Sequence, residues 1–505
     1  MTLRTIYISQ ISWLVALLLF SCSSGNEEEA YRYETTSVPV QFSSMVSQPT
    51  ETRAGTTGEM TDASVKATGF GVFAYHTDTQ AWTAAKATAT PNFMYNQLVT
   101  WNGELSDDYV TKWEYAPIKY WPNDFSTGDV DDQDDDQGNN AATGSQNGGR
   151  VSFFAYAPYA EVTPGTGAVT ETDAEDVVMN TWGIRALTTN AAADDPRVSY
   201  GLNPASVFLK DNVDLLWGVA PSGSYQSIGG VSAPTEGFPP KDLTKPSVIE
   251  AVKLRFLHAL AQLRILVQGA FDEVIPAEND VAEDTRILIN SLTVTMASPT
   301  GAWLNLNNTA ANMALWQTPL DATPQTFSFT LSKDDENVEG KLRADIRNQA
   351  DIRTYLSTAD NFDQLLEGVT VTPKNILNLP ESGDETDYGL LFIPAKNETE
   401  ADGKTLKSLN QVTVDVDYDV ITRDPSLVRN TSAGFSIVNN HIHRTLQLAG
   451  DVHFEASKKY TLRIILGMTT VKFEIIEVED WMTPITMNPL VREWITITKE
   501  YDINE

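Results

Sequence analysis

The chain has 505 residues, of which 41% are hydrophobic, and a formal net charge of −33. Its length predicts roughly two to four domains, at about 100–200 residues per domain. The charge argues against nucleic-acid binding, because phosphate recognition depends on clustered Lys and Arg side chains. Thr, Val, Asn, Asp and Gly are plentiful and long helical periods are scarce, which indicates an all-β fold.

The first segment has the pattern of a signal for export. Arg4 gives a basic start, and the apolar run from Ile11 to Phe20 is too short to span a bilayer core of about 30 Å as a mature helix. "LFSC" then places Leu19 three residues before Cys22, as in a bacterial lipobox. This predicts a signal peptide over 1–21 and acylation of Cys22, the single cysteine, so that no internal disulfide can form. The alternative is a general secretory signal with an incidental cysteine.

A short strand and a basic residue follow the export signal. Val38, Val40 and Phe42 alternate with polar residues and Pro39, which predicts a half-buried strand. A polar run comes next and contains the lone basic residue Arg53. The acidic "SSGNEEE" after the cysteine is similar to a signal for transfer to the outer face of the outer membrane.

Short strands separated by turn residues are expected through the first half of the chain. "GFGVFAYHT", "RVSFFAYAPY" and "NVDLLWGVA" predict buried strands. The Asp-rich stretch 129–149 between them predicts a loop, because such a composition buries little apolar surface. It fails as an EF-hand, since Asp134 and Asn140 stand where Gly and Glu are needed. The Gly-, Ser- and Pro-rich stretch 221–246 predicts a linker between domains.

The second half begins with an ambiguous segment, Val252 to Gly269, whose apolar residues match both a strand and a helix. Further strands are expected in "RILINSLTVTMA", "TFSFTLS", "YGLLFIPAKN", "QVTVDVDYDV", "YTLRIILGM" and "VKFEIIEVEDW". A short helix is expected near Lys341 to Leu356. At the C-terminus, "EWITITKEYDI" places Ile495, Ile497, Tyr501 and Ile503 on one strand face.

No sequence pattern supports catalysis, a cofactor or a metal. Motifs for a nucleophile elbow, a phosphate-binding loop and a zinc protease are all missing from the sequence. His441 and His443 would share one strand face and could begin a zinc site, but no third ligand follows nearby, so surface histidines are the simpler interpretation. His258 stands among apolar residues and is expected to be a hydrogen-bonded core histidine.

Several of these strings, in order along most of the chain, resemble the fimbrillin family of type V pilus subunits. They are the lipobox at Cys22, "VQFSS…TRAG", "GFGVFAY", "KYWP…VSFFAYAPY", "VDLLWGVA", "LRFLHALAQL", "LLFIPA" and "YTLRIILG…EVEDW". The resemblance implies two tandem transthyretin-like β-sandwich domains, over 54–248 and 249–490, and a strand at Val252 to Gln268. The Asp-rich loop and the length depart from the family pattern, which leaves open a stalk, accessory or tip role.

The resemblance also implies a mechanism of assembly. A trypsin-like surface protease would cut between Arg53 and Ala54 and release the propeptide 22–53. Val38, Val40 and Phe42 would leave with it, opening a groove whose unpaired edge requires another strand. The segment 491–505 of another subunit, with Ile495, Ile497, Tyr501 and Ile503, would fill that groove in a head-to-tail polymer. The alternative for this segment is an edge strand of its own domain.

The expected partners are therefore other pilus subunits, the maturation protease and a host or bacterial surface ligand, with no cofactor. The precursor would be an outer-membrane lipoprotein at the cell surface, and the mature form would lie in the pilus. A competing interpretation is a surface lipoprotein that binds glycans or host proteins and never polymerises. A glycan-processing enzyme is disfavoured, because no paired carboxylates stand at recognisable positions.

Overall fold

The structure is a computed structural model of the whole chain, and the residues that it describes form four β-sheets and three short helices. The described residues are 39–45, 57–103, 111–122, 149–161, 163–164, 175–177, 182–189, 196–222, 235–245, 251–270, 285–296, 298–317, 327–332, 374–375, 389–394, 411–424, 426–427, 434–447, 454–467 and 471–480. The all-β class predicted from the sequence is confirmed.

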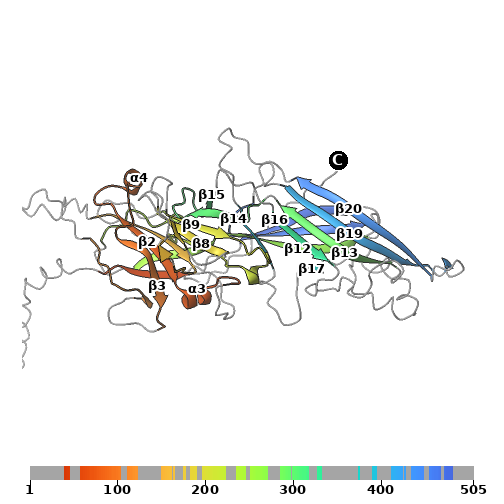
Figure 1. Cartoon of the computed structure of the whole chain (residues 1–505), viewed down its shortest axis with the longest axis horizontal. Coiled ribbons are helices and arrows are strands. Elements are labelled where there is room, and N and C mark those ends of the chain that lie inside the picture. Colours follow the sequence, from red (N-terminus) through yellow and green to blue (C-terminus); the bar gives the residue numbers. More distant parts are fainter. Residues whose placement is uncertain are drawn as a thin grey trace, which may run out of the picture.

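The first and second sheets lie at one end of an elongated molecule, and the third and fourth lie at the other (Figure 1). In order across it, the first sheet contains β1 (Gln41–Met45), β11 (Ala251–His258), β10 (Leu216–Val219), β5 (Val151–Ala157), β2 (Phe70–His76), β3 (Met94–Trp101) and β4 (Trp113–Glu114). The second contains β15 (Leu315–Gln317), β14 (Gly301–Asn305), β9 (Arg197–Gly201), β8 (Gly183–Thr188), β7 (Glu175–Val177) and β6 (Thr163–Pro164).

The third sheet is built on two long parallel neighbours, β12 and β21, and the fourth on long antiparallel strands. The third contains β17 (Lys374–Asn375), β12 (Ala261–Ala270), β21 (Lys458–Gly467) and β22 (Val471–Asp480), with β18 (Leu390–Phe392) also paired to β12. The fourth contains β16 (Phe327–Ser332), β13 (Thr285–Met296), β19 (Gln411–Arg423) and β20 (Phe435–Gln447).

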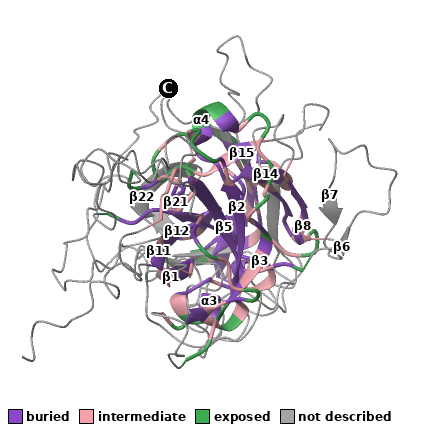
Figure 2. Ribbon diagram, turned by 90° about the vertical axis from the view of Figure 1, so that its left-hand side faces the viewer, coloured by how far each residue is buried: buried purple, intermediate pink, exposed green. Residues whose placement is uncertain are grey.

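The central strands of the first sheet are buried on both faces, which explains their continuous apolar sequences (Figure 2). On β2, Phe70 and Val72 enter one core cluster, whereas Phe73 and Tyr75 enter the other. The cluster that contains Phe70 is formed mainly by side chains of the first sheet, from β1, β2, β3, β5 and β11. The other cluster continues through the second, third and fourth sheets, so the two ends of the molecule share one apolar core.

The chain passes from the first sheet to the third at a bend between β11 and β12. The segment predicted as strand over Val252 to Gln268 is thus two strands, and the residues at the bend are Ala259 and Leu260. The Trp316 indole donates to the Ala259 carbonyl at 2.6 Å, and the Ala259 amide donates to the Leu215 carbonyl at 2.8 Å. These contacts fix the direction in which β12 leaves the first sheet.

Strand pairing crosses the predicted division between residues 248 and 249. β11 pairs with β10 in the first sheet, and β14 pairs with β9 in the second. Part of the predicted linker is also paired, because Leu243 forms a bridge with Val151 of β5. The division into two domains, 54–248 and 249–490, stays a prediction, as does the role of 221–246 as a linker.

The three helices are short and lie outside the sheets. α3 (Asp62–Thr68) begins after Thr61, whose side chain accepts a hydrogen bond from the Ser64 amide, and ends at Gly69, whose φ of 70° suits a residue without Cβ. α4 (Trp82–Ala85) and the 3₁₀ helix η3 (Leu209–Asp211) are each about one turn long. Among the described residues, no helix has the length and apolarity needed to cross a membrane. The loop expected at 129–149 lies mostly outside the described residues, and the helix expected at 341–356 lies wholly outside them.

Candidate functional site: the β1 groove

The segment 39–45 connects the two ends of the first sheet, because β1 pairs with β11 and the two residues just before β1 contact the segment after β4. All five residues of β1 pair in parallel register with Ala251–Arg255 of β11. On the other edge, Pro39 forms an antiparallel bridge with Tyr120. The Val40 amide also donates to the Lys119 carbonyl at 2.8 Å. The segment that follows β4 and the strand β11 therefore form the two walls of a groove that β1 occupies.

The floor of this groove is an aromatic pocket around Phe42. Val40 and Phe42 are both 0% exposed. The Phe42 ring meets three others edge to face, with centroid distances of 6.1 Å to Phe70, 5.6 Å to Tyr115 and 5.8 Å to Phe153. Complete burial of the Val40 and Phe42 side chains contributes roughly 3–6 kcal/mol before the entropy of ordering is subtracted.

Side chains on either side of β4 also hold the main chain of residues 40 and 42, and Thr111, just before β4, is counted here with the wall. The Tyr115 hydroxyl donates to the Val40 carbonyl at 2.8 Å and accepts from the Lys119 amide at 3.1 Å. The Thr111 hydroxyl donates to the Phe42 carbonyl at 2.6 Å. The wall thus supplies side-chain hydroxyls to carbonyls that a neighbouring strand would otherwise satisfy.

The structure shifts the strand that was expected at Val38 to Phe42. Pairing with β11 runs from Gln41 to Met45, and Pro39, which has no N–H, contributes a single bridge before it. Of the three residues in the predicted displaced strand, Val40 and Phe42 point into the core, and Val38 lies outside the described residues. Their displacement stays a prediction.

The other predicted sites also lie outside the described residues, so their roles stay predictions. They are the lipid attachment site Cys22, the cleavage site Arg53–Ala54, and the donor residues Ile495, Ile497, Tyr501 and Ile503.

A buried contact between Asp214 and His258 holds the chain just after the predicted cleavage site. The Asp214 carboxylate lies 2.7 Å from His258 Nδ1 and accepts from the Met60 amide at 2.9 Å. The Gly58 amide donates to the Asn212 carbonyl at 3.0 Å, and Glu59 lies 3.6 Å from Lys459 of β21. His258 is the core histidine expected from the sequence. Its partner Asp214, which stands just before the neighbouring strand β10, was not expected from the sequence.

Burial raises the pKa of the Asp214 carboxyl, and the neighbouring His258 partly opposes this shift. The unfolded chain has an Asp pKa of about 3.9. Because the folded pKa is higher, the contribution of this carboxyl to stability is full below about pH 4 and is lost as the pH rises through the folded pKa.

We expect Asp214→Asn to remove this pH dependence, because the amide does not titrate. As the pH rises from about 4 towards 7, the stability of the wild-type chain should fall relative to that of the variant. Urea-unfolding midpoints of both chains across this range give the difference directly. A difference in midpoint that is constant with pH, or that grows in favour of the wild type, would contradict the raised pKa of Asp214.

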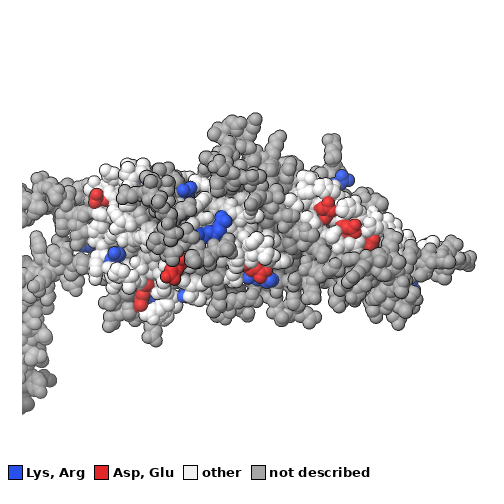
Figure 3. All heavy atoms as spheres, viewed as in Figure 1, with Lys and Arg blue, Asp and Glu red and all other residues white. Residues whose placement is uncertain are grey.

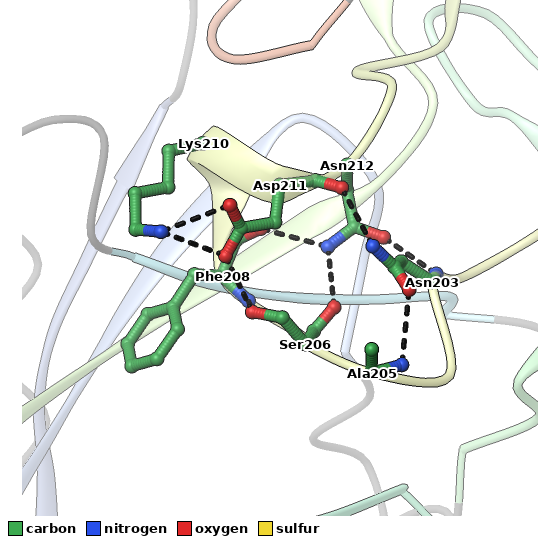
Figure 4. A network of polar contacts seen from close by, with 7 residues as sticks. All are labelled: Asn203, Ala205, Ser206, Phe208, Lys210, Asp211 and Asn212. Atoms are coloured by element: carbon green, nitrogen blue, oxygen red, sulfur yellow. Dashed lines mark hydrogen bonds and ion pairs between the residues drawn. The ribbon is translucent and has the colours of Figure 1, made fainter. Parts of the chain in front are cut away.

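A polar network around η3 holds Asn212, whose carbonyl accepts from the Gly58 amide (Figure 4). The Asn212 side chain donates to the carbonyls of Ser206 and Phe208 at 2.9 and 2.7 Å and accepts from the Asn203 amide at 2.7 Å. The stretch 203–212 that this network holds also contacts β18, because the Leu391 amide donates to the Val207 carbonyl at 2.9 Å. The sequence gives no signal for this network beyond its richness in Asn, Ser and Asp.

His441 and His443 lie opposite Asp417 and Asp415 of the neighbouring strand β19 in the fourth sheet. Acidic side chains gather at this end of the molecule (Figure 3). His443 Nδ1 is 3.0 Å from Asp415, and His441 lies 3.4 Å from Asp415 and 3.6 Å from Asp417. Both histidines are more than half exposed. Within the described part of the chain, no group of three His, Cys, Asp or Glu side chains is placed to hold a metal ion.

Comparison with known proteins gives a match over most of the chain. No protein-family model matches it. A fimbrium subunit from Phocaeicola vulgatus, Fim1C, is 24% identical over 429 residues, which are 84% of each protein. This chain is similar to a fimbrium subunit. A crystal structure of a fimbrial protein from Bacteroides vulgatus matches 88% of this chain and 99% of its own, at 19% identity and a TM-score of 0.49.

The similarity to the fimbrium subunit confirms the resemblance predicted from the ordered sequence strings. Because the match covers 429 residues, it is not limited to the pair of sheets at one end of the molecule.

Proposed function

We propose that this chain is a structural or accessory subunit of a cell-surface pilus, and not an enzyme. The observation that carries the proposal is the position of β1. It completes the first sheet and fills its core with Val40 and Phe42, yet its neighbours on both edges come from distant parts of the sequence. The similarity to a fimbrium subunit supports the same conclusion.

In this proposal, β1 is a temporary occupant of its groove. The precursor is acylated at Cys22, reaches the cell surface as an outer-membrane lipoprotein, and is cut between Arg53 and Ala54 by a trypsin-like protease. Release of 22–53 removes β1 together with the lipid. The exposed walls then carry unpaired amides and carbonyls, which favours the addition of another strand.

The replacement strand comes from the segment 491–505 of a second subunit. Its residues Ile495, Ile497, Tyr501 and Ile503 would supply apolar side chains to the floor of the groove. Because donor and acceptor surfaces differ, each added subunit leaves a free groove or a free donor, and the contact builds a filament that supports adhesion. The second candidate is a lipoprotein that binds glycans or host proteins without polymerising.

The amino-terminal residue of the protein recovered from the cell surface distinguishes these two candidates. We expect the polymerised fraction to begin at Ala54, because a chain that keeps β1 has no open groove. Edman sequencing or mass spectrometry of that fraction identifies the residue. A surface fraction that begins at acylated Cys22 throughout would reject the proposed maturation and favour the non-polymerising lipoprotein.

A further inference from the structure

The wall after β4 contacts β1 through a closed ring of hydrogen bonds. The Val40 amide donates to the Lys119 carbonyl, the Lys119 amide donates to the Tyr115 hydroxyl, and that hydroxyl donates to the Val40 carbonyl. Both main-chain groups of Val40 are therefore held by the wall. Two residues further on, the Thr111 hydroxyl holds the Phe42 carbonyl in the same way.

These contacts involve only main-chain atoms of β1. Every residue offers a carbonyl, and every residue except proline offers an amide, so the contacts do not depend on the sequence of the strand. The side chains of the same two residues point inward, where the pocket formed by Phe70, Tyr115 and Phe153 surrounds the second of them. The main-chain atoms of the strand thus provide the contacts that hold it, whereas its side chains determine which strand fits the pocket.

An empty groove would remove hydrogen bonds from the wall. Tyr115 is 5% exposed, and its hydroxyl, the Lys119 carbonyl and the Thr111 hydroxyl would each lose a contact with residue 40 or 42. Because a hydrogen bond to a largely buried group contributes to stability, the wall favours any strand that restores these contacts.

We propose that Tyr115, Thr111 and the Lys119 carbonyl form a main-chain clamp that holds whichever strand fills the β1 groove. This rests on the proposed exchange of β1 for a strand from a second copy of the chain. The clamp requires a residue other than proline at the position of Val40, the apolar cluster selects an apolar side chain there, and the pocket selects a large apolar side chain two residues later. Ile495 and Ile497 have this spacing, as do Tyr501 and Ile503.

The clamp can be tested by measuring how fast a cut β1 leaves its groove. The chain from Cys22 onward is produced without lipid, with the recognition sequence of a specific protease replacing 48–54, and a fluorophore is attached to Cys22. Cutting leaves β1 in place but no longer covalently joined. Its dissociation is followed by fluorescence anisotropy in the presence of excess unlabelled peptide of residues 36–47, which prevents rebinding.

We expect Tyr115→Phe to speed dissociation about tenfold, because it removes the hydroxyl from a shielded hydrogen bond and keeps the ring beside Phe42. Thr111→Val should speed it several-fold. The matched control is Thr100→Val, since the Thr100 hydroxyl donates to the Glu114 carbonyl in the same hairpin and does not contact β1. Its rate should stay within about twofold of the wild-type rate.

Rates within about twofold of the wild type for both clamp variants would overturn the proposal. An equal acceleration by Thr100→Val would do so as well, because it would indicate general loosening of the hairpin. If Tyr115→Phe does not fold, Thr111→Val decides the outcome. Faster release by the clamp variants, combined with no assembly of the cut wild-type chain, would leave the clamp standing and reject the proposed polymerisation.

Discussion

Replacing Phe42 with alanine is expected to lower the free energy of unfolding of the uncut chain by about 3–5 kcal/mol. The ring is completely buried, and its loss would leave Phe70, Tyr115 and Phe153 facing a cavity inside the first sheet. Because β1 is paired with β11 along its whole length, the surrounding core cannot collapse into the vacated space without disturbing strand pairing. Urea denaturation followed by tryptophan fluorescence measures the change.

The matched control for this experiment is Ser43→Ala on the same strand. Ser43 is half-buried, pairs with Lys253 of β11 and lies one residue from Phe42, so its side chain belongs to the opposite face of the strand. Its replacement should change the free energy of unfolding by no more than about 0.5 kcal/mol. Similar losses for both variants would show that strand pairing, and not the Phe42 pocket, holds β1 in place.

Arg53→Ala is expected to abolish maturation and polymer formation while leaving the fold unchanged. A trypsin-like protease requires a basic side chain before the bond that it cuts, and without the cut β1 continues to fill the groove. Full-length precursor should accumulate at the cell surface, which immunoblotting and electron microscopy of shed filaments can show. The effect should be close to complete, because one groove cannot hold two strands.

Arg32→Ala is the matched control, since Arg32 is the other basic residue between Cys22 and Arg53. A cut after Arg32 would leave β1 attached to the chain, so this variant should mature and polymerise normally. Loss of filaments in the Arg32 variant alone would place the cleavage site upstream of β1. In that case β1 would remain in the mature subunit, and strand exchange through its groove would be wrong.

The strands themselves were predictable where apolar residues alternate or run continuously. β2 and β5 are buried on both faces, and this explains the unbroken apolar stretches from which they were predicted. The inward positions of Val40 and Phe42 follow from the period of two alone. The helix α3 was not predicted, although Thr61 and Gly69 stand at its two ends as typical capping residues.

The partners of each strand were not predictable, because pairing over long separations leaves no local signal. Periodicity cannot show that β11 joins the first sheet while β12 joins the third, since both are equally apolar. Nor can it show that Tyr115 and Thr111 reach the main chain of β1. The same holds for Asp214, whose neighbours suggested a plain buried strand.

The measurement that tests strand exchange most directly is a disulfide between the groove of one subunit and the C-terminal segment of the next. Cleavage removes Cys22, the single native cysteine, so cysteines introduced at Lys253 and Thr498 are the only thiols in the mature chain. Lys253 lies opposite Ser43 on β11, and Thr498 takes the position of Ser43 when Ile495 and Ile497 take those of Val40 and Phe42. Oxidation of matured protein should give a ladder of covalent oligomers on a non-reducing gel, whereas the pair Thr83→Cys and Thr498→Cys, with its first thiol at an exposed position of α4, should not. Filaments that form but yield no Lys253–Thr498 ladder, or the same ladder from the Thr83 pair, would contradict the insertion of the C-terminal segment into the β1 groove.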